Sequence, residues 1–166
     1  MIKYFLIVIG VFIVIFLVLM VLKRTKREKD VSRALGALCL KYNFKLEKVR
    51  DDYLISKGDK RIVIRVCPIP HNSSVTINSR TTWCLRWGGK RYGRGYPNQR
   101  YLNELNDFLK LKTSDSKVIL LYKTTEKILM YLNESEIASV SEGVKVYDYM
   151  VVTFNNLENV FPSLIN

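Results

Sequence analysis

The sequence predicts an α/β protein, a mixed sheet flanked by helices and preceded by one transmembrane helix. Three observations carry this prediction. An uncharged apolar run stands near the N-terminus, a helical stripe follows it, and short strand patterns then alternate with further helical stripes. Helices before, between and after runs of strands are typical of a mixed α/β domain.

The first element is the apolar run at residues 4–22, YFLIVIGVFIVIFLVLMVL. As a helix rising about 1.5 Å per residue it spans roughly 28 Å, close to the ~30 Å hydrocarbon core of a bilayer. Residues 23–29 carry five Lys or Arg, whereas only Lys3 precedes the run. The positive-inside rule therefore places the C-terminal part in the cytoplasm.

A cleaved signal peptide is the alternative for this run. Its apolar core would be too long, no small-x-small cleavage site follows, and the basic cluster stands where cleavage would occur. We therefore expect an uncleaved anchor in the cell membrane with its N-terminus outside. The expected parts are a short extracytoplasmic end at 1–3, the transmembrane helix at 4–22, a basic juxtamembrane segment at 23–30 and a cytoplasmic domain at 31–166.

The cytoplasmic part begins with a helix. Its apolar residues fall at helical spacing on one stripe, namely Val31, Ala34, Leu35, Leu38, Cys39 and Tyr42. The period then shortens to that of strands, with turn residues between them. The strands are expected at 44–49, 53–56, 61–67, 74–78 and 82–87, and successive short strands of this kind indicate an antiparallel meander.

A glycine-rich stretch at residues 88–100 is expected to be a loop. A second helical stripe follows, formed by Leu102, Leu105, Phe108 and Leu109. The continuous apolar run 117–122 is typical of a strand buried on both faces. Further strands are expected at 127–132 and 144–154, on either side of an acidic turn segment, and a short helix is expected to close the chain.

The charge balance favours a polyanionic partner. The chain carries a net charge of +12, and residues 30–166 alone hold 21 Lys or Arg against 14 Asp or Glu. Such an excess suits nucleic acid or the anionic cytoplasmic leaflet, and composition does not choose between them. A basic protein kept soluble by its charge is the third interpretation.

Cysteine use predicts buried free thiols. Cys39, Cys67 and Cys84 are odd in number and stand among apolar or aromatic neighbours, which fits a reducing cytoplasm. With His71, the pair Cys67 and Cys84 offers three metal ligands but no fourth and no CxxC pair. We assign neither a zinc site nor a Cys-His hydrolase.

Residues 80–101, here called the basic aromatic segment, contain six cations and no acid. Arginine interleaved with aromatic rings can hold a phosphate backbone while a ring stacks on a base. The alternative is that Trp83 belongs to the core, Trp87 caps a strand and the arginines form a solvated face. The candidate anion-binding residues are Arg80, Arg86, Lys90, Arg91, Arg94, Arg100, Tyr92 and Tyr96.

The order of these elements resembles the nuclease-related domain (NERD), a bacterial branch of the PD-(D/E)xK restriction-endonuclease-like fold. In that family the pattern DhhhxxxxGhhhhExK precedes a Trp-containing strand, a loop with Asn-Pro-x-x-Gln, a helix and a buried strand. Here DDYLISKGDKRIVIRVC matches the first pattern, Trp83 the second, and YPNQR the loop with one residue fewer. The resemblance covers most of residues 31–160 and implies DNA or RNA as partner.

The resemblance places the catalytic Asp on Asp52, the Glu on Arg65 and the Lys on Cys67. In such sites the two carboxylates hold Mg²⁺ and the lysine assists the attacking water. A guanidinium repels Mg²⁺, and a thiol does not replace an ammonium. We therefore expect a degenerate, inactive site in which Asp52 and Arg65 form a cross-strand ion pair, and no cofactor.

Two alternatives remain open at this stage. An active Mg²⁺-dependent nuclease would need acids that have moved to other positions, and Asp51, Glu47, Glu28 and Asp30 are the candidates. A membrane-surface scaffold would instead bind anionic lipid headgroups or a protein partner, without nucleic acid.

Overall fold

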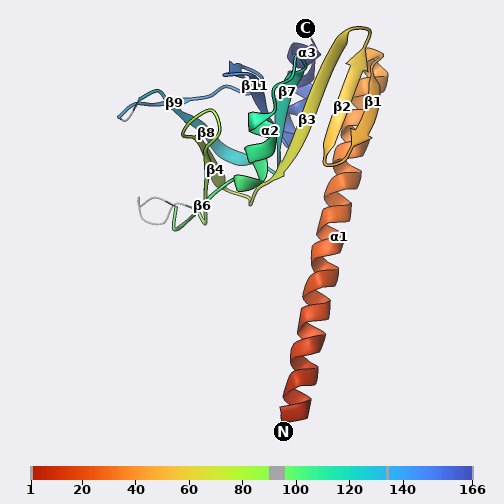
Figure 1. Cartoon of the computed structure of the whole chain (residues 1–166), viewed down its shortest axis with the longest axis vertical. Helices are drawn as coiled ribbons and strands as arrows, with labels where there is room; N and C mark the ends of the chain where they lie inside the picture. The colour runs from red at the N-terminus through yellow and green to blue at the C-terminus, as the bar shows by residue number, and fades with distance from the viewer. Residues whose placement is uncertain (1, 90–95, 134, 166) are drawn as a thin grey trace. The chain divides into compact units, whose positions relative to one another are not determined.

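The structure, a computed structural model, describes residues 2–89, 96–133 and 135–165, with side chains described from residue 9 onward. The chain divides into two compact units, Met1–Ala37 and Leu38–Asn166, each considered by itself below (Figure 1). The helix α1 (Ile2–Tyr42) makes up the first unit and continues into the second.

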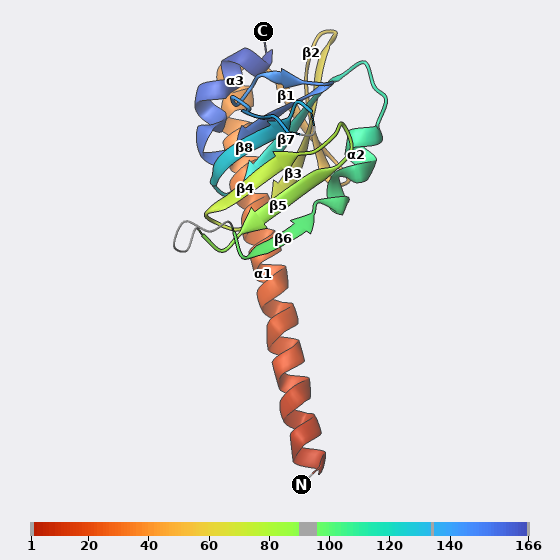
Figure 2. The same ribbon diagram turned by 90° about the vertical axis from the view of Figure 1, so that its left-hand side faces the viewer.

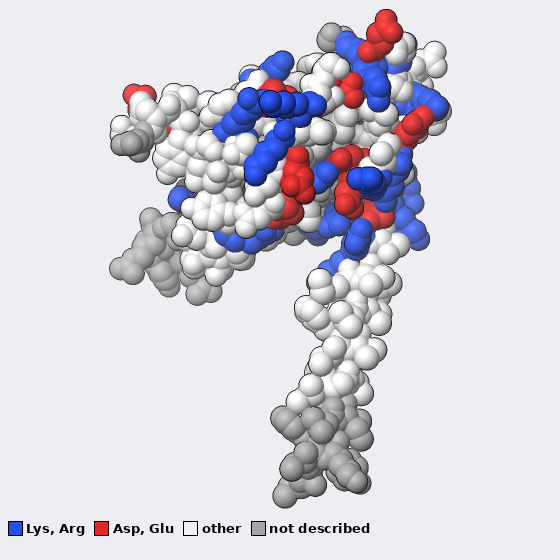
Figure 3. Space-filling view, viewed as in Figure 1, with Lys and Arg blue, Asp and Glu red and all other residues white. Residues whose placement is uncertain are grey.

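The first unit is an exposed apolar helix with a basic end. Its large apolar side chains from Ile9 to Leu22 leave between 39% and 69% of their surface exposed. Figure 3 shows this stretch without charge and the basic residues that follow it. In the part of the chain that the structure describes, no helix is both long and apolar enough to cross a bilayer, so the expected span at 4–22 is not supported.

The second unit contains two mixed sheets. The first sheet has the strand order β1-β2-β3-β7-β11-β10 among the described residues. β1 to β3 pair antiparallel, β7 runs parallel to both β3 and β11, and β10 closes the sheet antiparallel. Its strands are β1 (Lys45–Val49), β2 (Asp52–Lys57), β3 (Lys60–Pro68), β7 (Ser116–Tyr122), β10 (Lys145–Val146) and β11 (Tyr149–Thr153).

The second sheet has the order β6-β5-β4-β8-β9 among the described residues. β4 runs parallel to β8, and the other neighbours pair antiparallel. Figure 2 shows this sheet in front of the first. Its strands are β4 (Ser73–Ile77), β5 (Trp83–Trp87), β6 (Asn98–Tyr101), β8 (Thr125–Tyr131) and β9 (Ile137–Ser139).

The largest apolar core of this unit draws on both sheets and one helical segment. Val75, Ile77 and Leu85 come from the second sheet, and Ile119 and Val151 from the first. The helical segment is η1 (Asn103–Leu105) followed by α2 (Asn106–Lys110), whose apolar residues join the same core. A 3-10 turn, η2 (Phe154–Asn156), leads into the closing helix α3 (Leu157–Ile165).

The mixed α/β class is confirmed, and β1, β2 and β3, like β4 and β5, pair antiparallel as expected, but these strands do not form one continuous meander. β3 and β4 follow one another in sequence yet belong to different sheets. Pro68 ends β3 and Pro70 lies between the strands, and proline cannot donate a ladder hydrogen bond. The chain therefore leaves the first sheet here, and β3 takes β7 as its second neighbour.

Three smaller expectations also need correction. The expected loop 88–100 ends in β6, and the acidic turn segment contains β9. The expected strand 144–154 is two strands, β10 and β11, because Tyr147 adopts φ 55° and turns the chain between them. A positive φ is uncommon for a residue with a side chain and is typical of turns.

Candidate functional site

The ion pair Asp52–Arg65 stands at the position expected from the sequence. The two residues are directly opposed in the antiparallel register of β2 and β3. Nε of Arg65 donates to Oδ1 of Asp52, and a second hydrogen bond of 2.9 Å joins Nη2 to Oδ2. The side chains are 20% and 18% exposed. A two-pronged pair of this kind is the strongest geometry for arginine and carboxylate.

The surroundings of Arg65 keep it charged. Its guanidinium carbon lies 5.2 Å from the ring centroid of Phe108 in α2. The hydrogen bonds that Arg65 donates to Asp52 raise the pKa of Arg65 against the effect of burial, and the nearby carboxylates of Asp51 and Asp107 add to it. The position that the family pattern gives to a metal-binding carboxylate thus holds a permanent cation.

Cys67 lies two residues further along β3, with no exposed surface, and belongs to the main core. Cys39 and Cys84 are buried free thiols as well, as expected. Burial raises the pKa of Cys39 to about 11. Within the described ranges no three Cys, His, Asp or Glu side chains gather closely enough to hold a metal ion.

Acids from elsewhere in the chain neutralise much of the described part of the basic aromatic segment. Arg80 lies 3.1 Å from the carboxylate of Asp148. Arg100 makes a two-pronged pair with Glu104, with distances of 2.9 and 2.7 Å. The sequence alone does not indicate these partners, because Asp148 is remote in sequence and Glu104 lies beyond the segment.

Two further members of this segment are partly enclosed. The hydroxyl of Tyr96 donates to Glu126 over 2.5 Å, and burial together with this bond raises the pKa of Tyr96 to about 12. Nε of Arg86 is buried and has no hydrogen-bond partner among the described residues. Trp83 is 1% exposed and Trp87 is half-buried, so the core interpretation of Trp83 is confirmed.

Half of the candidate anion-binding residues lie outside the described residues. These are Lys90, Arg91, Tyr92 and Arg94. Their role stays a prediction from sequence.

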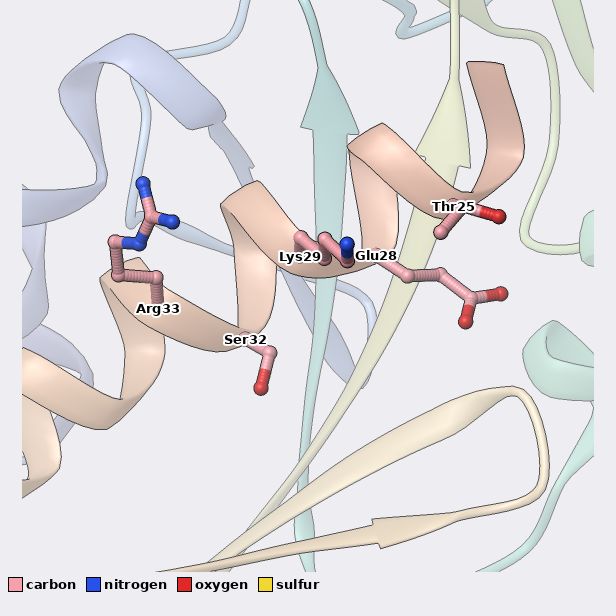
Figure 4. A pocket seen from close by; sticks show the side chains of 5 residues that line it. All are labelled: Thr25, Glu28, Lys29, Ser32 and Arg33. Carbon is pink, nitrogen blue, oxygen red and sulfur yellow. The ribbon is translucent and has the colours of Figure 1, made fainter. Parts of the chain in front are cut away.

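Glu47, one of the candidate acids for a relocated metal site, forms an ion pair with a neighbouring lysine. Its carboxylate lies 2.6 Å from Nζ of Lys45 on the same strand. Asp51 is exposed in the turn before β2. Glu28 and Asp30 belong to the first unit. Figure 4 shows Glu28 among five side chains that line a hollow on α1; since one helix supplies them all, the hollow is a groove in that helix's own surface.

A buried lysine that the sequence did not single out connects several elements. Lys117 on β7 is 2% exposed. Its Nζ donates to the backbone oxygens of Leu109 and Leu111 over 3.2 and 3.0 Å, and it lies 2.6 Å from Oδ2 of Asp148. In the sequence, Lys117 is the first residue of the apolar run 117–122. A charged residue at the start of such a run is the only sequence signal for a buried lysine here, and it is weak.

Comparison of the chain with protein families, with curated proteins and with solved structures found no match.

Proposed function

We propose that the chain is a membrane-anchored, non-catalytic binding module that carries a degenerate restriction-endonuclease-like domain and binds nucleic acid at the cytoplasmic face. The single observation that carries the loss of catalysis is the Asp52–Arg65 pair. A nuclease of the family pattern needs two carboxylates at these positions to hold Mg²⁺. A guanidinium that already occupies the carboxylate of Asp52 both repels the cation and blocks its ligand.

The order of elements supports the family part of the proposal. The antiparallel strands β1 to β3 come first, and β5, which carries Trp83, comes later in the chain. The helix α2 follows, and then the buried strand β7, which runs parallel to β3. This is the order that the resemblance implies. The second sheet is an addition to it.

The exposed apolar stretch of α1 supports the membrane part. Leaving many large apolar side chains in water is costly, at about 25 cal/mol per Å². The uncharged sequence extends to residue 4, and five Lys or Arg follow it at 23–29. Insertion with the basic end in the cytoplasm satisfies both features. Recovery of the chain in the soluble fraction after carbonate extraction of membranes would contradict the anchor.

The net charge of the chain after the apolar stretch and its basic end supports a polyanionic ligand. Residues 30–166 contain 21 Lys or Arg and 14 Asp or Glu, which leaves an excess of seven positive charges. Nucleic acid attracts such a surface by releasing counterions. The region from Lys90 to Arg94 supplies three of these charges within five residues.

One observation favours a second candidate, a scaffold that binds anionic lipid headgroups without nucleic acid. Arg80 and Arg100 are each paired with a carboxylate of the chain, so they are less available to nucleic acid. The five Lys or Arg at residues 23–29 directly follow the apolar stretch, and a polybasic segment beside a bilayer attracts anionic headgroups.

The test uses the full-length chain in maltoside micelles. We expect binding of fluorescent DNA or RNA that weakens with salt, and no cleavage with Mg²⁺ or Mn²⁺. Cleavage that Asp52→Ala abolishes would show that the site is active and would overturn the proposal. Binding to anionic vesicles but to neither DNA nor RNA would select the scaffold.

A further inference from the structure

A small polar cavity of about 140 Å³ lies between the second sheet and the η1–α2 segment. Figure 2 shows β6 running directly into this helical segment beside β5. The buried side chains of Trp83 and Leu102 form part of its wall. Its polar lining consists of Thr81, Thr82, Tyr101, Asn103, Asn106 and Lys110.

The side chains of these six residues are exposed or half-buried, and within the described ranges none has a hydrogen bond or ion pair. Some other cations of this unit are paired within the chain. Arg65, Arg100 and Lys117 are each held by a carboxylate. Polar groups that converge on a cavity without partners in their own chain are available to a ligand.

Helical spacing explains why the amides and the ammonium share one side. Asn103, Asn106 and Lys110 are three and four residues apart, so they lie along one face. The intervening Glu104 pairs with Arg100, and the carboxylate of Asp107 contributes to the raised pKa of Arg65. The acids of this segment therefore act on arginines, and they leave Lys110 as the one charged residue lining the described cavity.

Lys110 also makes no hydrogen bond to the carbonyl groups at the end of α2 among the described residues. Basic residues there often bond the last carbonyls. Here the buried Lys117 takes the oxygens of Leu109 and Leu111. The ammonium of Lys110 keeps its three donors for another acceptor.

We infer that this cavity binds one phosphate group of a single-stranded nucleic acid, with an adjacent base against Tyr101; the inference rests on the proposed function and names its ligand. One ammonium, two amides and the two threonine hydroxyls match an anion with several acceptor oxygens. At ~30 Å³ per water, the volume holds about five waters, enough for a phosphate but not for a whole nucleotide.

The base must therefore lie outside the cavity, where Tyr101 is 57% exposed. Only a strand whose bases are unpaired can stack on such a ring, and this favours a single strand over a duplex.

The binding experiment measures fluorescence anisotropy of a labelled oligothymidylate with the full-length chain in maltoside micelles. Lys110→Gln should flatten the slope of log K against log salt by about 0.7, the value of one phosphate contact on a single strand. Tyr101→Leu should weaken binding roughly 5- to 150-fold, as the loss of one stacked base does, while Tyr101→Phe should retain it. The matched control is Lys112→Gln, which removes an exposed lysine outside the cavity.

The variant Asn106→Asp separates a loss of binding from a loss of folding. A carboxylate in the first turn of α2 favours the helix, but it repels phosphate. We expect about tenfold weaker binding with an unchanged or raised melting temperature. Tight binding by this variant would overturn the inference.

The outcomes separate this inference from the proposed function. Wild-type binding that Lys110→Gln and Tyr101→Leu leave unchanged would overturn the cavity as the site while the function stands. Absence of oligothymidylate binding by the wild type, with a melting temperature that inorganic phosphate raises only when Lys110 is present, would overturn the nucleic-acid function and keep the phosphate site. Absence of both effects would overturn both.

Discussion

Nζ of Lys117 lies 2.6 Å from Oδ2 of Asp148, although the lysine side chain is only 1% exposed. The same carboxylate oxygen lies 3.1 Å from Arg80. One acid in the turn before β11 therefore holds a cation from the first sheet and a cation from the segment that precedes β5.

Removal of this acid should destabilise the second unit. Asp148→Ala leaves the buried Lys117 without its counter-charge, and we expect the free energy of unfolding to fall by about 3 kcal/mol. Urea unfolding of the full-length chain followed by tryptophan fluorescence measures it. The matched control is Asp59→Ala in the exposed turn between β2 and β3, expected within about 0.5 kcal/mol of wild type. Equal effects of the two substitutions would contradict the role of the cluster.

The same acid should also give a pH signature. Burial acts to raise the pKa of Asp148, but the hydrogen bonds from Lys117 and Arg80 outweigh it and lower the pKa from its ordinary 3.8. Because the folded pKa lies below the unfolded one, the stabilisation is complete above about pH 4 and is lost as the pH falls through the folded value. We expect the stability difference between wild type and Asp148→Asn to shrink on going from about pH 5 to about pH 3. A difference independent of pH would exclude this explanation.

A third prediction concerns the Asp52–Arg65 pair. Arg65→Glu would place a second carboxylate opposite Asp52 in the antiparallel register. Without metal, like charges on opposed strands should lower the stability by up to about 1 kcal/mol, in addition to the loss of the wild-type pair. Mg²⁺ should raise the melting temperature of this variant but not that of wild type, because two carboxylates restore a site for a hard cation. Arg65→Gln is the control, and an equal response of both variants to Mg²⁺ would count against the family interpretation.

Local patterns were sufficient for much of the first sheet and for the ion pair. The sequence predicted strands on both sides of Gly58, and the spacing of thirteen between Asp52 and Arg65 places them in register across that turn. A turn and its flanking strands involve neighbours in sequence, so their signals are short-range.

The pairing of β4 with β8 in the second sheet was not predictable in this way. β4 finds its parallel partner β8 about fifty residues later, and neither strand carries a sign of which partner it will take. The pairing of Arg80 with Asp148 has the same cause. Periodicity reports which face of an element is apolar, not which distant element covers it. The basic aromatic segment therefore looked more cationic in sequence than its described part is in the fold.

A fourth prediction tests how closely α3 packs on the turn before β10. Gly143 adopts φ 76°, and a Cβ added there would overlap Cγ1 of Val160 and lie 3.1 Å from Oγ of Ser163. Gly58 adopts φ 57° but faces open space. Gly58→Ala should thus cost about 1 kcal/mol from backbone strain alone. Gly143→Ala should cost about 1–3 kcal/mol more, because α3 must move. Similar losses in urea unfolding would show that α3 does not pack closely on this glycine.

The last prediction concerns which Lys and Arg side chains contact the phosphates of the proposed nucleic-acid ligand. Each neutralised phosphate contributes about −0.9 to the slope of log K against log salt on duplex DNA and about −0.7 on single strands. Replacing Lys90, Arg91 and Arg94 together by Ala should flatten the slope by about two to three units if all three contact phosphate. Arg100→Ala should change it much less, because Glu104 already neutralises Arg100 within the chain. Equal changes per charge would mean that Glu104 releases its arginine to the ligand, and a triple variant with the slope of wild type would remove the segment from the interface.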